Sequence, residues 1–201
     1  MIGANKKKSD FATPYTVSNA LTKGGAAVKL SALIMGLGNI AHKQIIKGLI
    51  FLAIEIGYIM FMVNAGAYYL SMLPSLGWRK QEEVFNEQKQ IYEYVQGDNS
   101  LLILLYGITV IFIICAYIIL AVSSLKSAYN VELRMKQGKH INTFVEDIKA
   151  LFNENLHKLL LVLPVTGILV FTILPLVFMI SMAFTSYSKV DSHLVLFDWV
   201  G

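Results

Sequence analysis

Three long runs without charged residues divide the chain. They extend over Ile56–Leu73, Leu101–Leu125 and Leu159–Ser188. A helix needs roughly 20 apolar residues to cross a hydrocarbon core about 30 Å thick. Each run therefore predicts a transmembrane helix. We expect an all-α integral membrane protein with three transmembrane helices and with amphipathic helices lying in the membrane interface.

The polar stretches between these runs complete the predicted organisation. It consists of a cytoplasmic leader with an interfacial helix (1–44), transmembrane helix 1 (45–73), an external loop (74–100), transmembrane helix 2 (101–125), a cytoplasmic loop with an amphipathic helix (126–158), transmembrane helix 3 (159–188) and an external segment that we expect to be truncated (189–201).

The distribution of charge gives these helices an orientation. Of the 201 residues, 56% are hydrophobic and 15% are charged, whereas a soluble domain carries about a quarter charged residues. The segment before residue 45 holds six basic residues, loop 74–100 three, loop 126–158 six and the last segment one. This alternation follows the positive-inside rule. We expect a cytoplasmic N-terminus and an external C-terminus, and the net charge of +4 is no reason to expect a nucleic-acid partner.

The stretch Val28–Lys47 shows helical spacing of apolar positions just before the first span. A short helix lying in the membrane interface, turning at Gly36 and Gly38 into the span, is one interpretation. A helix that packs as in a soluble protein is the alternative. The recurring apolar positions are Leu30, Leu33, Ile34 and Leu37.

Both long loops also contain periodic apolar positions. In the external loop, residues that recur at spacings of three and four, all of them apolar except Gln88, predict one amphipathic helix, which either covers the span ends or touches an external partner. These residues are Val84, Phe85, Gln88, Ile91 and Val95. In the cytoplasmic loop, Thr143 and Glu146 have the spacing of a capping box. The helix that follows would direct one apolar face to the interface or to another subunit; that face consists of Phe144, Ile148, Leu151 and Phe152.

A few polar or unusual residues occur within or beside the spans. Glu55 is either a structural residue at the cytoplasmic interface, which we favour, or a buried relay or partner contact. Asn64 lies in the same span, and Cys115 is interpreted as a small packing residue. The aromatic residues Tyr68, Tyr69 and Trp78 are expected where the first span leaves the membrane.

The third span contains two prolines, Pro164 and Pro175, with Gly167 between them. Their separation is close to three helical turns, so both face nearly the same side. Each removes a backbone hydrogen bond and tends to bend the helix. The bends either serve ordinary packing or shape a helix that flanks a moving or water-lined pathway. Side chains available to the freed carbonyls are Thr172, Ser181 and Thr185.

Catalytic patterns are missing from the sequence. The histidines are scattered and lack metal-ligand spacing, and Gly36 and Gly38 do not form a nucleotide-binding motif. We therefore expect no catalytic, cofactor-binding or metal site, no cofactor, and no enzyme activity in this chain. The histidines are His42, His140, His157 and His193.

Three stretches together resemble one family. They are GLGNIAHKQIIKGLIFL at Gly36–Leu52, QGDNSLLILLYGI at Gln96–Ile108 and LPVTGILVFTILPLVFMISMAFTSYS at Leu163–Ser188, the last followed by LFDWVG. They resemble the amino-terminal part of MalF-type permease subunits of bacterial ABC sugar importers, especially maltodextrin and related oligosaccharide permeases of Gram-positive bacteria and their wall-less relatives. The resemblance covers roughly residues 30 to 201.

This resemblance implies a subunit that moves maltose or maltodextrin-like oligosaccharides by alternating access. Its implied partners are a second permease subunit, a pair of ATPase subunits that hydrolyse ATP, an external sugar-binding protein and the lipid bilayer. The family's cytoplasmic E-A-A…G loop, which docks the ATPase, does not occur in this sequence. No residue is therefore assigned to sugar binding, and the chain looks like the front part of a permease.

A second hypothesis is a small three-span structural or regulatory membrane protein that is complete at this length. It predicts a stop codon after Gly201 and stable expression alone, whereas the permease hypothesis predicts a continuing reading frame. The sequence does not indicate which sugar would be carried.

Overall fold

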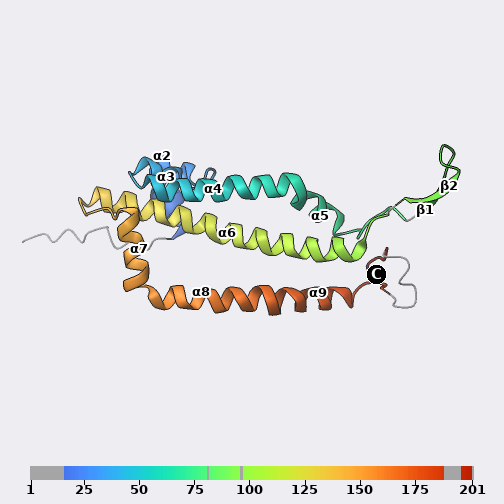
Figure 1. Ribbon diagram of the computed structural model, residues 1–201. Helices are drawn as coiled ribbons and strands as arrows, with labels where there is room; N and C mark the ends of the chain where they lie inside the picture. The colour runs from blue at the N-terminus through green and yellow to red at the C-terminus, as the bar shows by residue number, and fades with distance from the viewer. Residues whose placement is uncertain (1–15, 81, 96, 188–195, 201) are drawn as a thin grey trace, which may run out of the picture. The chain divides into compact units, whose positions relative to one another are not determined.

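The described part of the chain forms two compact units, each with its own small apolar core. The computed structural model describes residues 16–80, 82–95, 97–187 and 196–200 (Figure 1). The first unit comprises Met1–Tyr58 and Tyr117–Asn155, and the second comprises Ile59–Ala116 and Leu156–Gly201.

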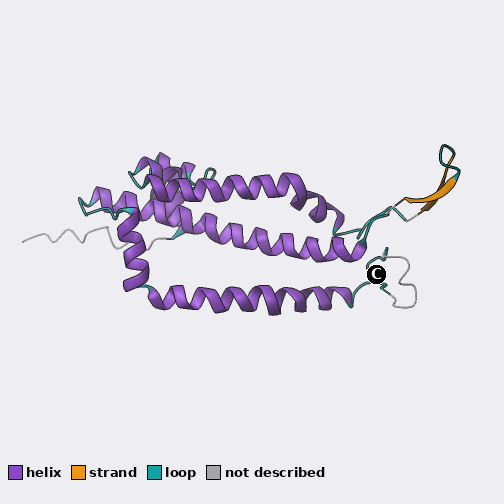
Figure 2. Ribbon diagram, viewed as in Figure 1, coloured by secondary structure: helices purple, strands orange, loops and turns teal. Residues whose placement is uncertain are grey.

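Three helices among the described residues are long and apolar enough to cross a membrane. Their most apolar windows have mean hydropathies of 2.0, 2.8 and 2.6, which confirms the predicted number of spanning helices. The helices are Ile45–Met72, Ser100–Lys136 and Leu156–Met182. Figure 2 shows how strongly helix dominates the chain.

Two of the three spans contain a short π-helical turn. The first span consists of α4 (Ile45–Phe61), the turn Met62–Gly66 and α5 (Ala67–Met72). The second span is the single helix α6 (Ser100–Lys136). The third consists of α8 (Leu156–Ile168), the turn Leu169–Ile173 and α9 (Leu174–Met182). In a π-helical turn one residue more than usual fits between hydrogen-bonded groups.

The prolines of the third span lie on either side of its π-helical turn. Pro164 is inside α8, and Pro175 is in the first turn of α9. Because a proline cannot donate the usual backbone hydrogen bond, a widened turn next to Pro175 is a common way to accommodate it. Helical structure is continuous from Leu156 to Met182, so the prolines alter the span locally without ending it.

In the first unit, the chain before the first span forms three short helices. They are α1 (Val17–Lys23), α2 (Ala26–Leu30) and α3 (Leu37–Ala41). We call residues 24–44 the elbow. The stretch 28–47, where we expected one short helix that turns at Gly36 and Gly38, contains two: α2 ends at Leu30, and Gly36, with φ of 82° in the left-handed region, precedes α3. A turn at Gly36 was expected, and only glycine adopts this conformation without strain.

The apolar core of the first unit lies where α1 and α2 pack on α6. It contains Ala20, Val28, Leu125, Ala128 and Tyr129, all nearly inaccessible to solvent. Beyond α6 the chain forms α7 (Phe144–Asn153). The capping box predicted there is confirmed, since the Thr143 side chain accepts from the Glu146 N–H and the Glu146 side chain accepts from the Thr143 N–H.

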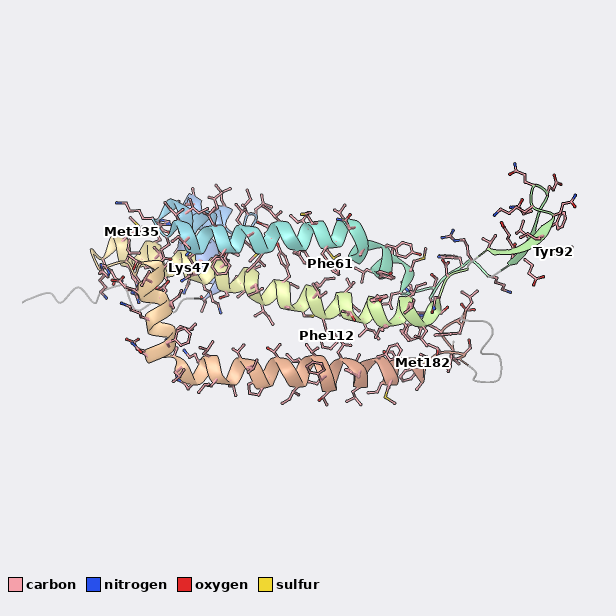
Figure 3. The ribbon with its side chains drawn as sticks, viewed as in Figure 1. Lys47, Phe61, Tyr92, Phe112, Met135 and Met182 are labelled. Carbon is pink, nitrogen blue, oxygen red and sulfur yellow. The ribbon has the colours of Figure 1, made fainter. Side chains whose placement is uncertain are left out.

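In the second unit, the loop 74–100 contains a β-hairpin where we expected one amphipathic helix. Strand β1 (Glu82–Asn86) pairs antiparallel with β2 (Ile91–Val95) (Figures 2 and 3). In this pairing Phe85 lies opposite Tyr92. The helical prediction for this loop is therefore wrong. Strand β2 consists mostly of β-branched and aromatic residues, and β1 contains Val84 and Phe85. Such residues favour strands, and this preference prevails over the approximate spacing of three and four.

The apolar core of the second unit joins the end of the first span, the start of α6 and the last described residues. Its members are Leu76, Ile103, Leu104, Ile108 and Phe197. The N–H of Phe197 donates to Ser100 Oγ at 3.0 Å, and Trp199 Nε1 donates to the carbonyl of Leu73, also at 3.0 Å. These bonds attach the segment 196–200 to the core although it is distant in sequence.

Candidate functional site

The most highly organised polar site of the described chain lies at the turn of the elbow. Two successive backbone N–H groups there donate to side chains from two different spanning helices. Met35 N–H donates to Glu55 Oε2 of α4 at 2.8 Å, and Gly36 N–H donates to Ser124 Oγ of α6 at 3.0 Å. An isolated backbone N–H in an apolar environment is costly. The two spans therefore supply the partners that allow this turn to be buried.

Two glycines let the elbow approach the first span closely. A Cβ atom at Gly36 would lie 2.2 Å from the carbonyl oxygen of Gly48, and one at Gly48 would lie 2.6 Å from the carbonyl oxygen of Gly36. No side chain fits between these backbones, because such distances are far below van der Waals contact. The elbow and the first part of α4 are therefore in direct backbone contact.

A second set of polar contacts continues from the same turn. Asn39 is completely buried, and its Nδ2 donates to Gln44 Oε1 at 2.9 Å and to Ser127 Oγ of α6 at 3.0 Å. Gln44 Nε2 in turn donates to the carbonyl of Asn142, just before α7, at 3.0 Å. This chain of amides links the elbow, α6 and the loop before α7, and buried amides connected in this way specify one arrangement.

The start of the elbow is held by a carboxylate near the end of α6. Gly25 N–H donates to Glu132 Oε2 at 2.8 Å, and Lys136, one helical turn further on, forms an ion pair with the same side chain. Glu132 is buried, with 5% of its surface exposed. The pairing with Lys136 offsets part of the cost of burying that charge.

Glu55 has a second hydrogen-bond partner, in the second span. Tyr117 O–H donates to Glu55 Oε1 at 3.4 Å, and the ring of Tyr117 stacks on Tyr58 with centroids 3.8 Å apart. Glu55 is 7% exposed. The carboxylate of Glu55 therefore contacts both the elbow and the second span.

The remaining residues singled out in the spans are not brought into this site. Asn64 Nδ2 donates to the carbonyl of Met60 at 2.7 Å inside the first span. The side chain of Cys115 is exposed in the chain by itself, so the packing expected of it is not made within the described chain. Thr185 Oγ1 donates to the carbonyl of Met182 at 2.7 Å, which satisfies a carbonyl at the end of α9.

The histidines of the described residues form no common site. His42 Nδ1 contacts the carbonyl of Gly38, and His140 Nε2 lies 2.9 Å from Glu146 Oε2 at the start of α7. His193 lies outside the described residues. Among the residues that were described, no group of three or more His, Cys, Asp or Glu side chains could hold a metal ion.

In the second unit, Asp98 organises the chain on either side of the hairpin. Its Oδ2 accepts from the backbone N–H groups of Trp78 and Arg79, at 2.9 and 3.0 Å. These two hydrogen bonds hold the pKa of the Asp98 carboxyl below its usual value, and the bond from Trp78 has the larger effect. At α7, hydrogen bonds likewise lower the pKa of Glu146; the bond from the Thr143 N–H has the larger effect and that from His140 the smaller.

Sequence reasoning missed several of these residues. Met35, Ser124, Ser127 and Asp98 carry no local pattern, because their partners are distant in sequence. A close backbone approach at Gly48 could have been predicted, because Gly48 shares a glycine-containing stretch with Gly36 and Gly38 at the start of an apolar helix. The arrangement as a whole anchors backbone and holds helices together, which is the chemistry of a scaffold.

The chain is similar to three named transport proteins over most of its length. It is 29% identical over 176 residues to the maltodextrin transport system permease protein MalC of Streptococcus pneumoniae, covering 86% of this chain and 37% of that protein. It is 30% identical over 189 residues to the maltodextrin transport system permease protein MdxF of Bacillus subtilis, covering 91% and 39%. The galactooligosaccharides transport system permease protein GanP of Bacillus subtilis is 25% identical over 177 residues, covering 86% and 38%.

The chain spans less than two fifths of the length of these relatives. No protein-family model matches the chain, and no solved structure matches it either. All three relatives are named as permease proteins, which agrees with the three apolar helices of this chain. Over most of its length the chain is thus homologous to the permease proteins of bacterial sugar-transport systems, which confirms the resemblance seen in its sequence.

Proposed function

We propose that this chain forms part of the membrane-spanning permease subunit of an ATP-driven sugar importer. The observation that carries the proposal is the similarity to sugar-transport permeases over 86 to 91% of the chain, coinciding with three helices able to span a membrane. The chain itself performs no catalysis, and ATP is hydrolysed by separate ATPase subunits.

Two of the three relatives are named for maltodextrin and one for galactooligosaccharides. The transported solute in our proposal is a maltose or maltodextrin-like oligosaccharide, moved by alternating access. The partners are a second permease subunit, an ATPase pair and an external sugar-binding protein.

The orientation belongs to the same proposal. The positive-inside pattern of the loops places the N-terminus, the elbow and α7 on the cytoplasmic side of a bacterial cell membrane. The β-hairpin and the segment 196–200 then lie outside. The elbow contacts to Glu55 and Ser124 support a rigid pairing of the first two spans on the cytoplasmic side.

A direct test combines association with uptake. A tagged full-length protein, carrying this chain with whatever reading frame adjoins it, is expected to co-purify with an ATPase pair and a second permease. Cells in which its gene is interrupted should lose uptake of labelled maltotetraose and keep uptake of an unrelated solute.

The solute is decided by competition in the same uptake assay. Excess unlabelled maltodextrin should suppress uptake of the labelled sugar, and excess galactooligosaccharide should not. The reverse order would replace the maltodextrin assignment by a galactooligosaccharide one. Failure of the full-length protein to associate with any ATPase, together with undiminished uptake, would count against a permease and in favour of a structural or regulatory membrane protein.

A further inference from the structure

An apolar groove in the first unit lies between the start of α4 and the start of α7. It has a volume of about 300 Å³, and its wall includes the side chains of Ile45, Ile46 and Phe144. Ile45 and Ile46 are 56% and 54% exposed. Neighbouring apolar side chains open to solvent mark a surface that is covered in the working protein.

Two lysines border this groove, against one carboxylate. Lys47 Nζ lies 3.0 Å from Asp147 Oδ2, and both side chains are partly exposed. Lys43 also lines the groove, and it pairs with none of the carboxylates in the described part of the chain. The groove therefore combines an apolar wall with an uncompensated positive charge.

The position of the groove identifies the kind of molecule that meets it. Ile45 is the first residue of a helix long enough to cross the membrane, so the groove lies where the hydrocarbon region gives way to headgroups. The exposed apolar side chains of α7 continue from it, with Ile148, Leu151 and Phe152 at 39%, 40% and 56% exposure. An amphipathic helix of this kind places its apolar face in the membrane interface.

We propose that the groove between α4 and α7 binds an anionic phospholipid. The acyl chains lie against Ile45, Ile46 and Phe144, and the phosphate group is bound by Lys43 with Lys47 beside it. Basic pockets next to spanning helices recognise anionic headgroups in this way. The site requires only that the chain spans a membrane, and it is independent of which solute the permease carries.

Lys43 offers a substitution that separates charge from fold. Its backbone is in the left-handed region, with φ of 68°, a conformation that asparagine tolerates better than most residues. Lys43→Asn therefore removes the ammonium group and keeps the turn. Lys29→Asn, on the exposed side of α2, is the matched control, because it removes the same charge from outside the groove.

The experiment titrates phosphatidylglycerol and phosphatidylcholine onto the detergent-solubilised full chain and counts bound lipids by native mass spectrometry. We expect phosphatidylglycerol to be retained in preference to phosphatidylcholine. Lys43→Asn should weaken phosphatidylglycerol binding about fivefold, since one lysine near a headgroup contributes roughly that factor, and Lys29→Asn should not. Equal retention of both lipids, or equal losses in the two variants, would overturn the proposal.

A second pair of variants tests the apolar wall. Phe144→Ser should weaken phosphatidylglycerol binding, whereas Phe152→Ser, on the same helix but outside the groove, should leave it unchanged. This pair decides the question even if Lys43→Asn does not fold. Equal effects of the two serine variants would contradict a specific lipid site in the groove. The proposal would also be contradicted if an acidic apolar peptide occupied the groove and phosphatidylglycerol could not displace it.

Discussion

The carboxylate of Glu55, in the first spanning helix, accepts a hydrogen bond from the backbone nitrogen of Met35, 2.8 Å away. Glu55 thus satisfies a polar backbone group that the elbow buries against the span. A charged residue in a membrane segment usually suggests a transport or relay role. Here its main contact is with the protein's own backbone.

Replacing Glu55 by an apolar residue should loosen the elbow. Glu55→Leu leaves the Met35 N–H without its acceptor, and a buried donor left unsatisfied costs about 1 to 3 kcal/mol. We expect a lower free energy of unfolding in detergent and faster proteolysis within residues 24–44. Glu55→Gln keeps an acceptor oxygen and is the control. Equal stability of the leucine variant and the wild type would show that this bond is dispensable.

The backbone contact between Gly36 and Gly48 should not tolerate a methyl group. Gly48→Ala would place Cβ 2.4 Å from Ile40 Cγ1 and 2.6 Å from the carbonyl oxygen of Gly36. Forced overpacking of this kind costs about 1 to 3 kcal/mol, which thermal unfolding of the purified chain would measure.

Gly57 in the same helix provides the comparison for Gly48. A Cβ there would meet nothing within 4 Å. Gly57→Ala is expected to be neutral or slightly stabilising, because alanine favours helix by about 1 kcal/mol over glycine. Similar losses at Gly48 and Gly57 would indicate that backbone flexibility matters and that the close approach does not.

The capping box of α7 should control the order of that helix. Thr143→Ala removes the acceptor for the Glu146 N–H, at a cost of about 1 kcal/mol. We expect faster amide hydrogen exchange over Phe144–Asn153 and unchanged exchange in α6. Thr143→Ser retains the hydroxyl and should behave as the wild type does. Uniform acceleration across the chain would instead point to global destabilisation.

Acid should weaken the hydrogen bonds by which the Asp98 carboxylate holds the backbone N–H groups of Trp78 and Arg79. The pKa of Asp98 is lowered by the N–H groups of Trp78 and Arg79, so its contribution to stability is complete above the unfolded pKa of about 4. That contribution is lost as the pH falls through the lower pKa of the folded state. Tryptophan emission followed from neutral pH downward should therefore change in the wild type at a pH below 4.

Asp98→Asn should remove this acid transition, because the amide does not titrate. Glu87→Gln removes one negative charge from the exposed turn of the hairpin and should leave the transition in place. A transition that persists in Asp98→Asn would assign it to another carboxyl group.

The spanning helices could be predicted because their signal is local. A run such as Leu101–Leu125 is apolar in every direction, and the bilayer requires that of any single helix. The capping box at Thr143 and Glu146 is likewise contained within four residues. Both kinds of prediction depend only on neighbours in sequence.

The hairpin was mispredicted because its alternation is weak. In the pairing, Phe85 and Tyr92 share one face, and Val84 and Glu93 share the other. A two-stranded sheet has no second layer against which one face must be apolar, so apolar residues occur on both faces. Positions 84, 85, 91 and 95 then fit a helical spacing by coincidence.

The elbow contacts could not be predicted because they join distant positions. Gly36 meets Ser124 and Gly25 meets Glu132, and nothing near either glycine specifies a partner in α6. The sequence does suggest that Gly36 turns the chain, since glycine readily adopts positive φ. Which helix the turn approaches is decided by packing.

The touching backbones of Gly36 and Gly48 also have a mechanical consequence. Two segments separated by long side chains can slide or tilt when those side chains change rotamer. Two main chains in direct contact cannot move relative to each other in this way. Together with the hydrogen bond from Met35 to Glu55, this contact makes the elbow and the start of α4 one rigid body. A displacement of the residues before the elbow, caused by a partner or by the lipid surface, would therefore move the first span as a whole. It would not be taken up by a change of conformation within the elbow.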